Sequence, residues 1–222
     1  MNNYPLTMKN DHMFLELQSG PWLLDTGAPT SFGSEGTASI EKADFAIQSN
    51  YMGMDINQIK GATDIDMVGL LGTDVLNNFD FLLDLPSETA TISSGEIEHV
   101  GSPLNLNEFM GIPIVTAGIS GHEFQMFLDT GAQISYLQDE ILETFPKSGP
   151  LTDFYPGFGT FETETYSAKV NLDNVQFSLR CGTLPQLLGM TLMMGGTQGI
   201  LGNDIFRDRK VGYFPRRGLL VI

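Results

Sequence analysis

The sequence predicts an all-β protein built from two similar lobes, and two repeated patterns carry that prediction. The tripeptide Asp-Thr-Gly occurs once in each half of the 222-residue chain, as Asp25-Thr26-Gly27 and as Asp129-Thr130-Gly131. An apolar-apolar-Gly block follows each copy, as Leu70-Leu71-Gly72 and as Ile200-Leu201-Gly202. Two motifs repeated in the same order indicate an internal duplication. We therefore expect residues 1–100 and 101–222 to form two β-barrel-like lobes related by a pseudo-twofold axis.

Each lobe is expected to begin with two short strands, the second of which ends at its Asp-Thr-Gly. In the first lobe the strands are residues 12–18 and 22–25, and in the second they are residues 112–118 and 123–129. Short strands separated by glycine-containing turns are typical of all-β proteins.

The rest of each lobe is predicted from the segments around its apolar-apolar-Gly block. A short helix should follow each block, at residues 73–78 and 203–207, with Thr73 or Asn203 as the N-cap. Two closing strands should come next, at 79–85 and 88–93 and then at 210–214 and 218–222, with 95–110 as the linker between lobes.

The second lobe holds an insertion. The aspartates are 104 residues apart (129 − 25), whereas Leu70 and Ile200 are 130 apart (200 − 70), so 26 residues are added (130 − 104). Part of the insertion lies in residues 151–179, where an aromatic, glycine-containing segment at 153–161 precedes a β-rich run. This composition predicts a β-hairpin with its tip at 153–161.

The repeated turn also predicts a chemistry. An apolar strand ending in Asp-Thr-Gly places a carboxylate at the end of a buried strand, and the glycine permits a sharp turn. A pseudo-twofold axis would bring Asp25 and Asp129 face to face. Because two adjacent carboxylates cannot both ionise, the pair would hold one proton. The ionised member can take a proton from water and the other can give one to a carbonyl oxygen, which predicts amide hydrolysis by activated water.

The paired Asp-Thr-Gly-Ala turns, each with a later apolar-apolar-Gly block, resemble the aspartic proteases, the superfamily of pepsin and the retroviral proteases. Ala28 and Ala132 resemble the retropepsin pattern, whereas duplication within one chain is pepsin-like. The resemblance implies an acid protease fold and an endopeptidase that acts as a monomer on extended polypeptides. It also implies residue roles: Asp25 and Asp129 as catalytic dyad, Thr26 and Thr130 as braces between the turns, Gly27, Gly131, Gly72 and Gly202 as support, and Ala28 and Ala132 at the substrate.

The family's mobile β-hairpin, or flap, is expected in the second lobe because the insertion lies there. Tyr155 and Phe158 would then cover the substrate. The alternative is that these aromatics fill a gap in the core. The shorter segment 43–61 of the first lobe, with Tyr51 and Met54, would be a second flap or simple packing. An inactive, peptide-binding adaptor with the same fold is the alternative to an active enzyme.

Composition excludes several function classes. A net charge of −16 argues against nucleic acid or an anionic membrane as partner. The single cysteine, Cys181, rules out an intramolecular disulfide and points to a reducing compartment or a bacterial source. The first 18 residues do not resemble a signal peptide, and no apolar run is long enough to span a bilayer, so a cytoplasmic location or a trimmed sequence is expected.

The other candidate residues have ordinary interpretations. His12, His99 and His122 have no metal-ligand spacing and are expected at the surface or in turns, so no metal or cofactor is predicted. The methionine-rich run 189–196 is expected in the core or in a loop that lines the substrate site. A basic group near the C-terminus should form a solvated edge, and its members are Arg207, Arg209, Lys210, Arg216 and Arg217.

Overall fold

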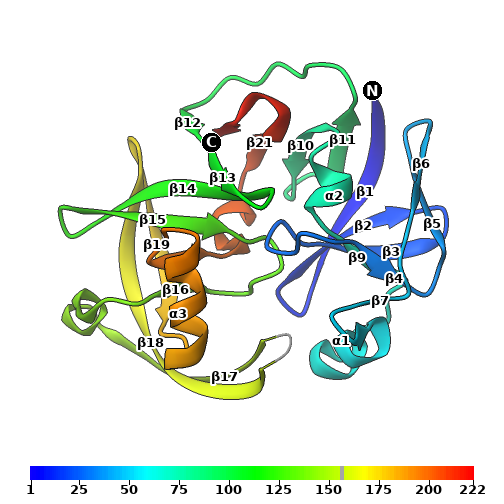
Figure 1. Cartoon of the computed structure of the whole chain (residues 1–222). Helices are drawn as coiled ribbons and strands as arrows, with labels where there is room; N and C mark the ends of the chain where they lie inside the picture. Colours follow the sequence, from blue (N-terminus) through cyan, green and yellow to red (C-terminus); the bar gives the residue numbers. More distant parts are fainter. Residues whose placement is uncertain (156–157) are drawn as a thin grey trace.

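The computed structural model describes residues 1–155 and 158–222, and it consists of two β-rich halves packed side by side (Figure 1). Strands dominate and the helices are short, so the prediction of an all-β protein is confirmed. Among the described residues no helix has the length and the apolar composition that crossing a bilayer requires. The compartment predicted from the sequence stays a prediction.

The elements of the first half follow the predicted order. They are β1 (Asn2–Lys9), β2 (His12–Leu17), β3 (Gly20–Leu24), β4 (Phe32–Gly33), β5 (Thr37–Ile40), β6 (Ala43–Ala46), β7 (Asn50–Tyr51), β8 (Met54–Asp55), α1 (Ile56–Thr63), β9 (Gly69–Leu71), α2 (Thr73–Leu76), β10 (Asp80–Asp84) and β11 (Thr89–Ser93).

The elements of the second half include longer strands before its Asp-Thr-Gly turn. They are β12 (Pro103–Asn105), β13 (Asn107–Phe109), β14 (Ile112–Ile119), β15 (His122–Leu128), β16 (Ser135–Leu137), η1 (Glu140–Thr144), β17 (Lys147–Tyr155), β18 (Gly159–Leu172), β19 (Val175–Gly182), α3 (Gln186–Met194), β20 (Gly199–Leu201), η2 (Asn203–Phe206), β21 (Lys210–Phe214), η3 (Pro215–Arg217) and β22 (Leu219–Val221).

The same parallel strand pair lies at the centre of each half. In the first half β3 pairs with β9, so that Leu24 lies opposite Leu71. In the second half β15 pairs with β20, and Leu128 lies opposite Leu201. The strand that ends at Asp-Thr-Gly is therefore locked beside the strand that ends at the apolar-apolar-Gly block. This pairing explains why the two motifs recur together.

A ten-stranded sheet joins the two halves. Its order is β12-β22-β21-β10-β11-β1-β2-β3-β9-β4, so strands from beyond residue 200 pair with strands from the first 100. The junction is β10 against β21, where Phe81 lies opposite Tyr213. The second sheet has the order β13-β14-β15-β20-β16-β19-β18-β17 and contains only residues of the second half.

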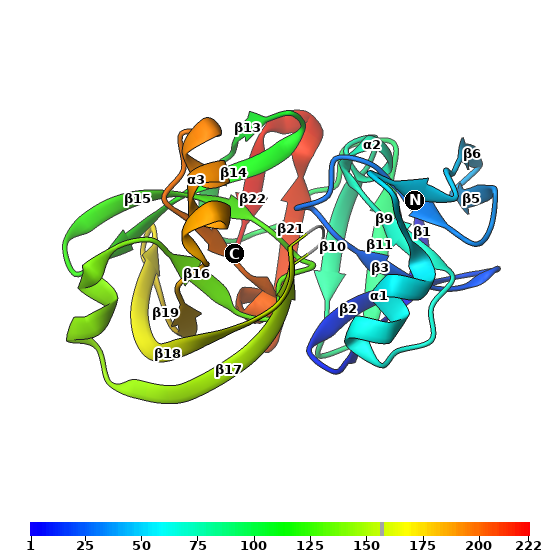
Figure 2. The ribbon, with the colours of Figure 1, turned by 60° about the horizontal axis from the view of Figure 1, so that its bottom comes forward.

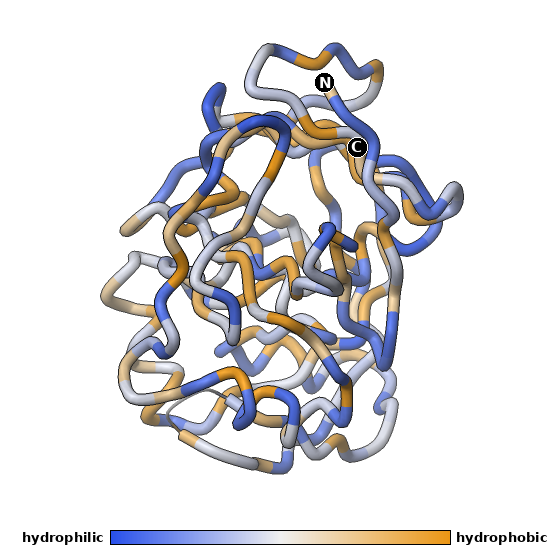
Figure 3. Tube along the Cα trace, turned by 90° about the vertical axis from the view of Figure 1, so that its right-hand side faces the viewer, coloured by the Kyte–Doolittle hydropathy of each residue, from blue (hydrophilic) through white to orange (hydrophobic). Residues whose placement is uncertain are grey.

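Burial of apolar side chains explains the layering. Figure 3 shows hydrophobic segments concentrated on the inner strands and hydrophilic ones at the outer turns. Trp22 is fully buried in the main core cluster. A Cβ at Gly69 would collide with the Trp22 ring, so the glycine that opens β9 makes room for the largest side chain of the core.

Both halves carry hairpins between the Asp-Thr-Gly turn and the apolar-apolar-Gly block, and these hairpins differ in length. In the second half β17 and β18 form a long hairpin, which agrees with the insertion predicted from the sequence. In the first half the hairpin that follows β4 is β5–β6, with four residues in each strand. Figures 1 and 2 both show β5–β6 on the side away from the second half, whereas β17–β18 extends toward the junction. The segment with Tyr51 and Met54 is a separate small hairpin, β7–β8.

Two local expectations were wrong. The short helices after the blocks are capped by Gly72 and Gly202, not by Thr73 and Asn203, and the second is a 3-10 helix. The methionine-rich run lies neither in the core nor in a loop but in helix α3, which buries Leu188 and Leu192 and exposes its methionines. The segment 95–110, predicted to link the lobes, also contains β12 and β13, which pair with β22 and β14.

The basic group near the C-terminus is not a simple solvated edge. Arg216 and Arg217 both bind the carboxyl of Asp80, at 3.0 and 2.7 Å, and Asp80 is fully buried at the start of β10. Arg207 binds Asp11 and Asp204, and Lys210 binds Asp84. Arg209 lies over the Phe177 ring. These cations therefore hold together elements that are far apart in the sequence.

Candidate active site

The two Asp-Thr-Gly turns have the same hydrogen bonds. The backbone N–H of Asp25 donates to Leu71 at 3.0 Å, and that of Asp129 donates to Leu201 at 2.9 Å. Within each turn the glycine N–H donates to the aspartate Oδ1, from Gly27 to Asp25 and from Gly131 to Asp129, both at 2.9 Å. Each carboxylate is thus held by its own turn, at the end of a strand that the neighbouring strand fixes.

Thr26 and Thr130 bind the two turns to each other. The Thr26 Oγ1 accepts from the Thr130 N–H at 3.0 Å, and the Thr130 Oγ1 accepts from the Thr26 N–H at the same distance. Each hydroxyl then donates across the junction, Thr26 to the Leu128 carbonyl at 2.6 Å and Thr130 to the Leu24 carbonyl at 2.8 Å. Both threonines are buried, so the four bonds are shielded from water.

The turns bring the carboxyls of Asp25 and Asp129 together. A Cβ at Gly131 would lie 2.6 Å from the Asp25 Cγ, and a Cβ at Gly27 would collide with the Asp129 carboxyl. Glycine is therefore required in both turns, because each carboxyl packs against the other turn's glycine. Both aspartates are half-buried, so the pair is surrounded by protein yet reachable by water.

This environment favours one shared proton. Removal from water raises the pKa of Asp25 well above its usual range, and the charge of Asp129 and a hydrogen bond with its carboxyl raise it further. Removal from water also raises the pKa of Asp129, against a lowering by the hydrogen bond from Asp25. The two groups titrate as a pair, with Asp25 the more readily protonated member.

The glycines of the two blocks close a loop behind each turn. A Cβ at Gly72 would lie 2.6 Å from the Ala28 carbonyl oxygen, and one at Gly202 would lie 2.9 Å from that of Ala132. The next N–H along the chain donates to the same carbonyl, from Thr73 at 2.8 Å and from Asn203 at 3.0 Å. The block and the turn are therefore in backbone contact in both halves.

Two serines that complete these loops were not predicted. The hydroxyl of Ser31 accepts from the Gly72 N–H at 2.8 Å, and that of Ser135 accepts from the Gly202 N–H at 3.1 Å. Ser31 also donates to Asp74 at 2.6 Å. The signal was present in the sequence, because each serine follows its Asp by six residues (31 − 25 and 135 − 129).

Apolar side chains flank the carboxyl pair on both sides. Ala28 packs against a cluster of the first half that includes Phe32, Ile56 and Leu70. Ala132 packs against a cluster of the second half that includes Leu188 and Ile200. Both alanines thus lie between the turns and an apolar wall.

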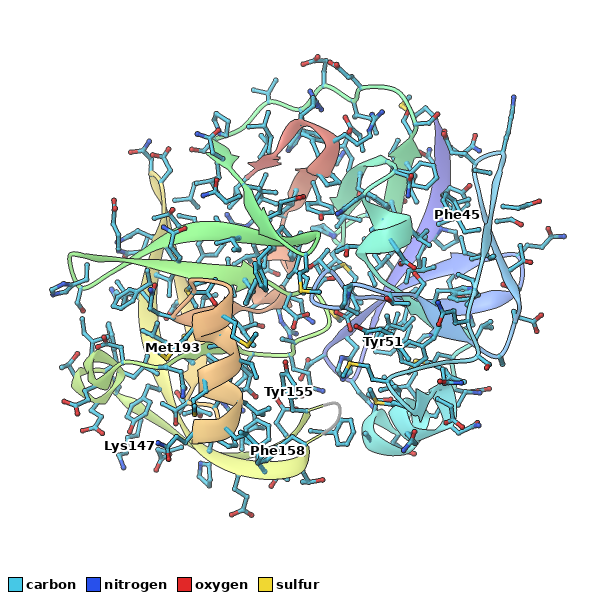
Figure 4. All side chains as sticks on the ribbon, viewed as in Figure 1. Phe45, Tyr51, Lys147, Tyr155, Phe158 and Met193 are labelled. Atoms are coloured by element: carbon cyan, nitrogen blue, oxygen red, sulfur yellow. The ribbon has the colours of Figure 1, made fainter. Side chains whose placement is uncertain are left out.

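The β17–β18 hairpin reaches both of these clusters. Phe154 packs against the cluster of the first half, whereas Tyr155 packs against that of the second half and beside Thr191 of α3. Removal from water raises the pKa of the Tyr155 hydroxyl, and the charges of Asp129 and Asp25 raise it further, so Tyr155 lies near the carboxyl pair as an uncharged phenol. Figure 4 shows Tyr155 on the hairpin beside α3, with Tyr51 of the first half across from it.

The rest of the predicted hairpin tip is less enclosed. Phe158 is 40% exposed and packs edge-on against Phe161. Residues 156 and 157, which the sequence placed at the tip, lie outside the described residues.

His12 was expected at the surface or in a turn, but it is the first residue of β2 and is buried. Its side chain lies against the second Asp-Thr-Gly turn, with Nδ1 3.2 Å from the Gly131 carbonyl oxygen. Its Nε2 lies 2.9 Å from the amide nitrogen of Gln133. No local sequence pattern marks this position, because the partners of His12 are more than 100 residues away in the chain. His99 and His122 are partly or fully exposed.

In the described part of the chain, no three His, Cys, Asp or Glu side chains are grouped so that they could hold a metal ion. Cys181 is buried and free, and burial raises the pKa of its thiol to about 12, so the thiol stays protonated at neutral pH.

Residues 111–213 match the family model for retroviral aspartyl proteases. The matched region contains the second Asp-Thr-Gly turn and its block, and the first half repeats the same arrangement. By this match the second half of the chain belongs to the aspartic protease superfamily and is retropepsin-like. The two-lobed acid protease fold expected from the resemblance agrees with the all-β architecture of the whole chain. No curated protein matches the chain.

Proposed function

We propose that this aspartic protease is an active endopeptidase whose catalytic groups are Asp25 and Asp129. The observation that carries the proposal is the half-buried carboxyl pair, in which each carboxyl packs against the glycine of the other turn. Holding two carboxyls together away from water costs folding free energy, and such pairs are found where proton transfer is needed. A binding module would have no use for both.

In the proposed reaction a water molecule lies between the carboxyls. The ionised group, assigned to Asp129, takes a proton from the water while the water oxygen bonds to the carbonyl carbon of the substrate. Asp25 gives its proton to the carbonyl oxygen, so a neutral gem-diol forms. Asp129 then protonates the amide nitrogen, the C–N bond breaks, and the proton of one diol hydroxyl returns to Asp25 as the carboxylic acid product forms.

The surroundings of the carboxyls suggest an extended substrate with apolar side chains. Ala28 and Ala132 leave room near the dyad, and each adjoins an apolar cluster that would receive a side chain. The β17–β18 hairpin would act as the flap, with Tyr155 and Phe158 over the bound chain. A hinged hairpin admits the chain and then excludes bulk water from the reacting groups.

Replacement of either carboxyl tests the assignment. Asp25→Asn and Asp129→Asn should each abolish cleavage of an unstructured protein such as casein at mildly acid pH, because one shared proton requires both groups. The matched control is Asp66→Asn, since the Asp66 side chain is 95% exposed and has no assigned role in the reaction. A statine transition-state inhibitor should block the wild type. Near wild-type turnover in either dyad variant would overturn the assignment, and peptide binding without cleavage by wild type would favour an adaptor.

We further propose that the active species is a monomer, with residues 1–100 and 101–222 as its two lobes. Both turns and both apolar clusters are supplied by one chain, so a second copy is not needed to complete the site. Specific activity should therefore stay constant on dilution, and light scattering should give the mass of one chain. A specific activity that falls as a dimer dissociates would contradict this.

A further inference from the structure

The turn between β1 and β2, residues 10 and 11, and the start of β2 contact the second Asp-Thr-Gly turn from the opposite half of the molecule. His12, the first residue of β2, supplies the central side chain of this contact and is only 9% exposed. The Gly131 carbonyl can only accept, so the ring Nδ1, 3.2 Å away, must carry the hydrogen. The amide nitrogen of Gln133 can only donate, so the ring Nε2, 2.9 Å away, must accept. Both contacts are satisfied only by the neutral ring protonated at Nδ1.

The orientation of Gln133 is fixed independently. Its amide nitrogen also donates to the Asn10 carbonyl at 2.9 Å. If the amide rotated to offer its oxygen to a protonated His12, that bond would be lost and two oxygens would face each other. In the hydrogen bonds that link Asn10, Gln133, His12 and Gly131, the donor and the acceptor of each bond are therefore fixed.

A second contact from the same turn supports the neighbouring carbonyl. The Asn203 side-chain N–H group donates to the Asp11 carbonyl at 2.8 Å and to the Thr130 carbonyl at 3.3 Å. In the other half, the turn before β14 has a simpler contact, in which Asn77 donates to the Gly111 carbonyl at 2.9 Å. Ile112 there takes the place of His12 and has no ring nitrogen. The ring contact is thus specific to the turn that carries Asp129.

The charged groups around His12 form ion pairs or hydrogen bonds with residues other than His12. Asp11 on its own turn binds Arg207 of the second half at 2.9 Å. Lys9, opposite His12 on β1, binds Glu16 at 3.1 Å. Asp153 of β17 accepts from the Tyr136 hydroxyl. Removal from water lowers the pKa of His12, and the Gly131 contact and the charges of Asp153 and Asp11 oppose this without reversing it.

We propose that neutral His12 is a positioning residue, which holds the turn of Asp129 in place between the Gly131 carbonyl and the Gln133 side chain, and that protonation of the ring breaks its contact with Gln133 and shifts the turn. The proposal rests on the proposed peptidase function for its consequence in catalysis, but the coupling itself is a property of the folded chain. Protonation makes both ring nitrogens donors, so Nε2–H would face the Gln133 N–H group and the buried ring would carry a charge.

The direct test is a pH titration by NMR of wild type, His12→Asn and the matched control His122→Asn, since His122 is exposed. In wild type, the carbonyl carbon resonance of Gly131 should move at the midpoint of the His12 ring, which should lie below the usual range of a histidine because the ring is buried. This step should vanish in His12→Asn, whose Nδ2 takes the place of Nδ1 but does not titrate, and should persist in His122→Asn. A Gly131 resonance that does not shift at the midpoint of the His12 titration would overturn the proposal.

A kinetic arm tests the consequence. His12→Leu should lower kcat about tenfold with KM changed less than about twofold, because the turn is misplaced while the substrate walls remain. His12→Asn should keep wild-type kcat near neutral pH and retain more activity than wild type as pH falls below about 6.5. Wild-type kcat in a folded His12→Leu would overturn the proposal, and the Asn variant decides if the Leu variant does not fold. If wild type cleaves nothing, the proposed function fails, and the NMR arm still decides the coupling.

Discussion

At the scale of single residues, the site depends on side chains that serve the opposite half. Thr26 and Thr130 each accept from the other turn and donate to the strand before it. Removing one hydroxyl would leave a buried N–H and a buried carbonyl without partners, which costs more than the net value of the lost bonds. Each turn therefore needs a threonine at this position to hydrogen-bond the other half, which explains why both copies contain one.

Ala28 and Ala132 are expected to affect the range of pH over which the carboxyl pair keeps its shared proton. Neither side chain can donate to a carboxylate, so the ionised form is stabilised by the hydrogen bond between the two carboxyls and by backbone N–H groups alone. Adding hydroxyls by Ala28→Ser with Ala132→Thr should favour that form and lower the pKa at which the shared proton is lost. We expect the basic limb of the pH–activity profile to move down by about one pH unit. An unchanged basic limb in the folded double variant would contradict the argument.

The sequence reaches some of these residues and not others for a physical reason. Asp25, Thr26 and Gly27 are recognisable because the chain repeats them, and the fixed offset of Ser31 and Ser135 carries the same kind of signal. His12 is not repeated, and its role depends on a contact with Gly131, 119 residues away. A residue defined only by a long-range contact leaves no local pattern in one sequence.

At the scale of elements, the two halves differ most in their hairpins. The insertion predicted a long hairpin in the second half, and β17–β18 agrees with it. The helix α3 could not be predicted from composition, because a methionine-rich run suits a buried loop as well as a helix. Its register became clear only from packing, which buries Leu188 and Leu192 against the apolar cluster beside Ala132.

The flap assignment predicts how this hairpin responds to truncation. Tyr155→Ala and Phe158→Ala should each lower kcat/KM about tenfold, because the substrate is less well covered. The melting temperature should change by less than about 4 °C, as expected for side chains that add little to the core. Met193→Ala is the control, since Met193 lies on the neighbouring helix and is 75% exposed. A large drop in melting temperature with unchanged kcat/KM would mean that the aromatics are core residues.

At the scale of the whole molecule, one buried ion group ties the C-terminal strands to the first half. Asp80 is fully buried and receives Arg216 at 3.0 Å and Arg217 at 2.7 Å. The Asp80 carboxyl also accepts from the Ile97 N–H at 3.1 Å. The basic residues were predicted as a solvated edge because the sequence places their partner 136 and 137 residues away.

Removal of this carboxylate should destabilise the fold. Asp80→Ala would leave Arg216 without its acidic partner and Arg217 with only the exposed Glu96 at 3.9 Å, and we expect a loss of about 3 kcal/mol in the free energy of unfolding. The control is Asp84→Ala, which breaks the more exposed pair with Lys210 and should cost about 1 kcal/mol or less. Urea denaturation measures both. Equal losses in the two variants would contradict the structural role of Asp80.

The sheet that crosses between the halves also determines when the fold can be completed during synthesis. Strand β10 is made early, but its neighbour β21 comes more than 120 residues later, after both Asp-Thr-Gly turns. Until residues 210–214 have left the ribosome, β10 has an unpaired edge and the ten-stranded sheet is incomplete. On the proposed function, peptidase activity should therefore appear only after β21 has been made.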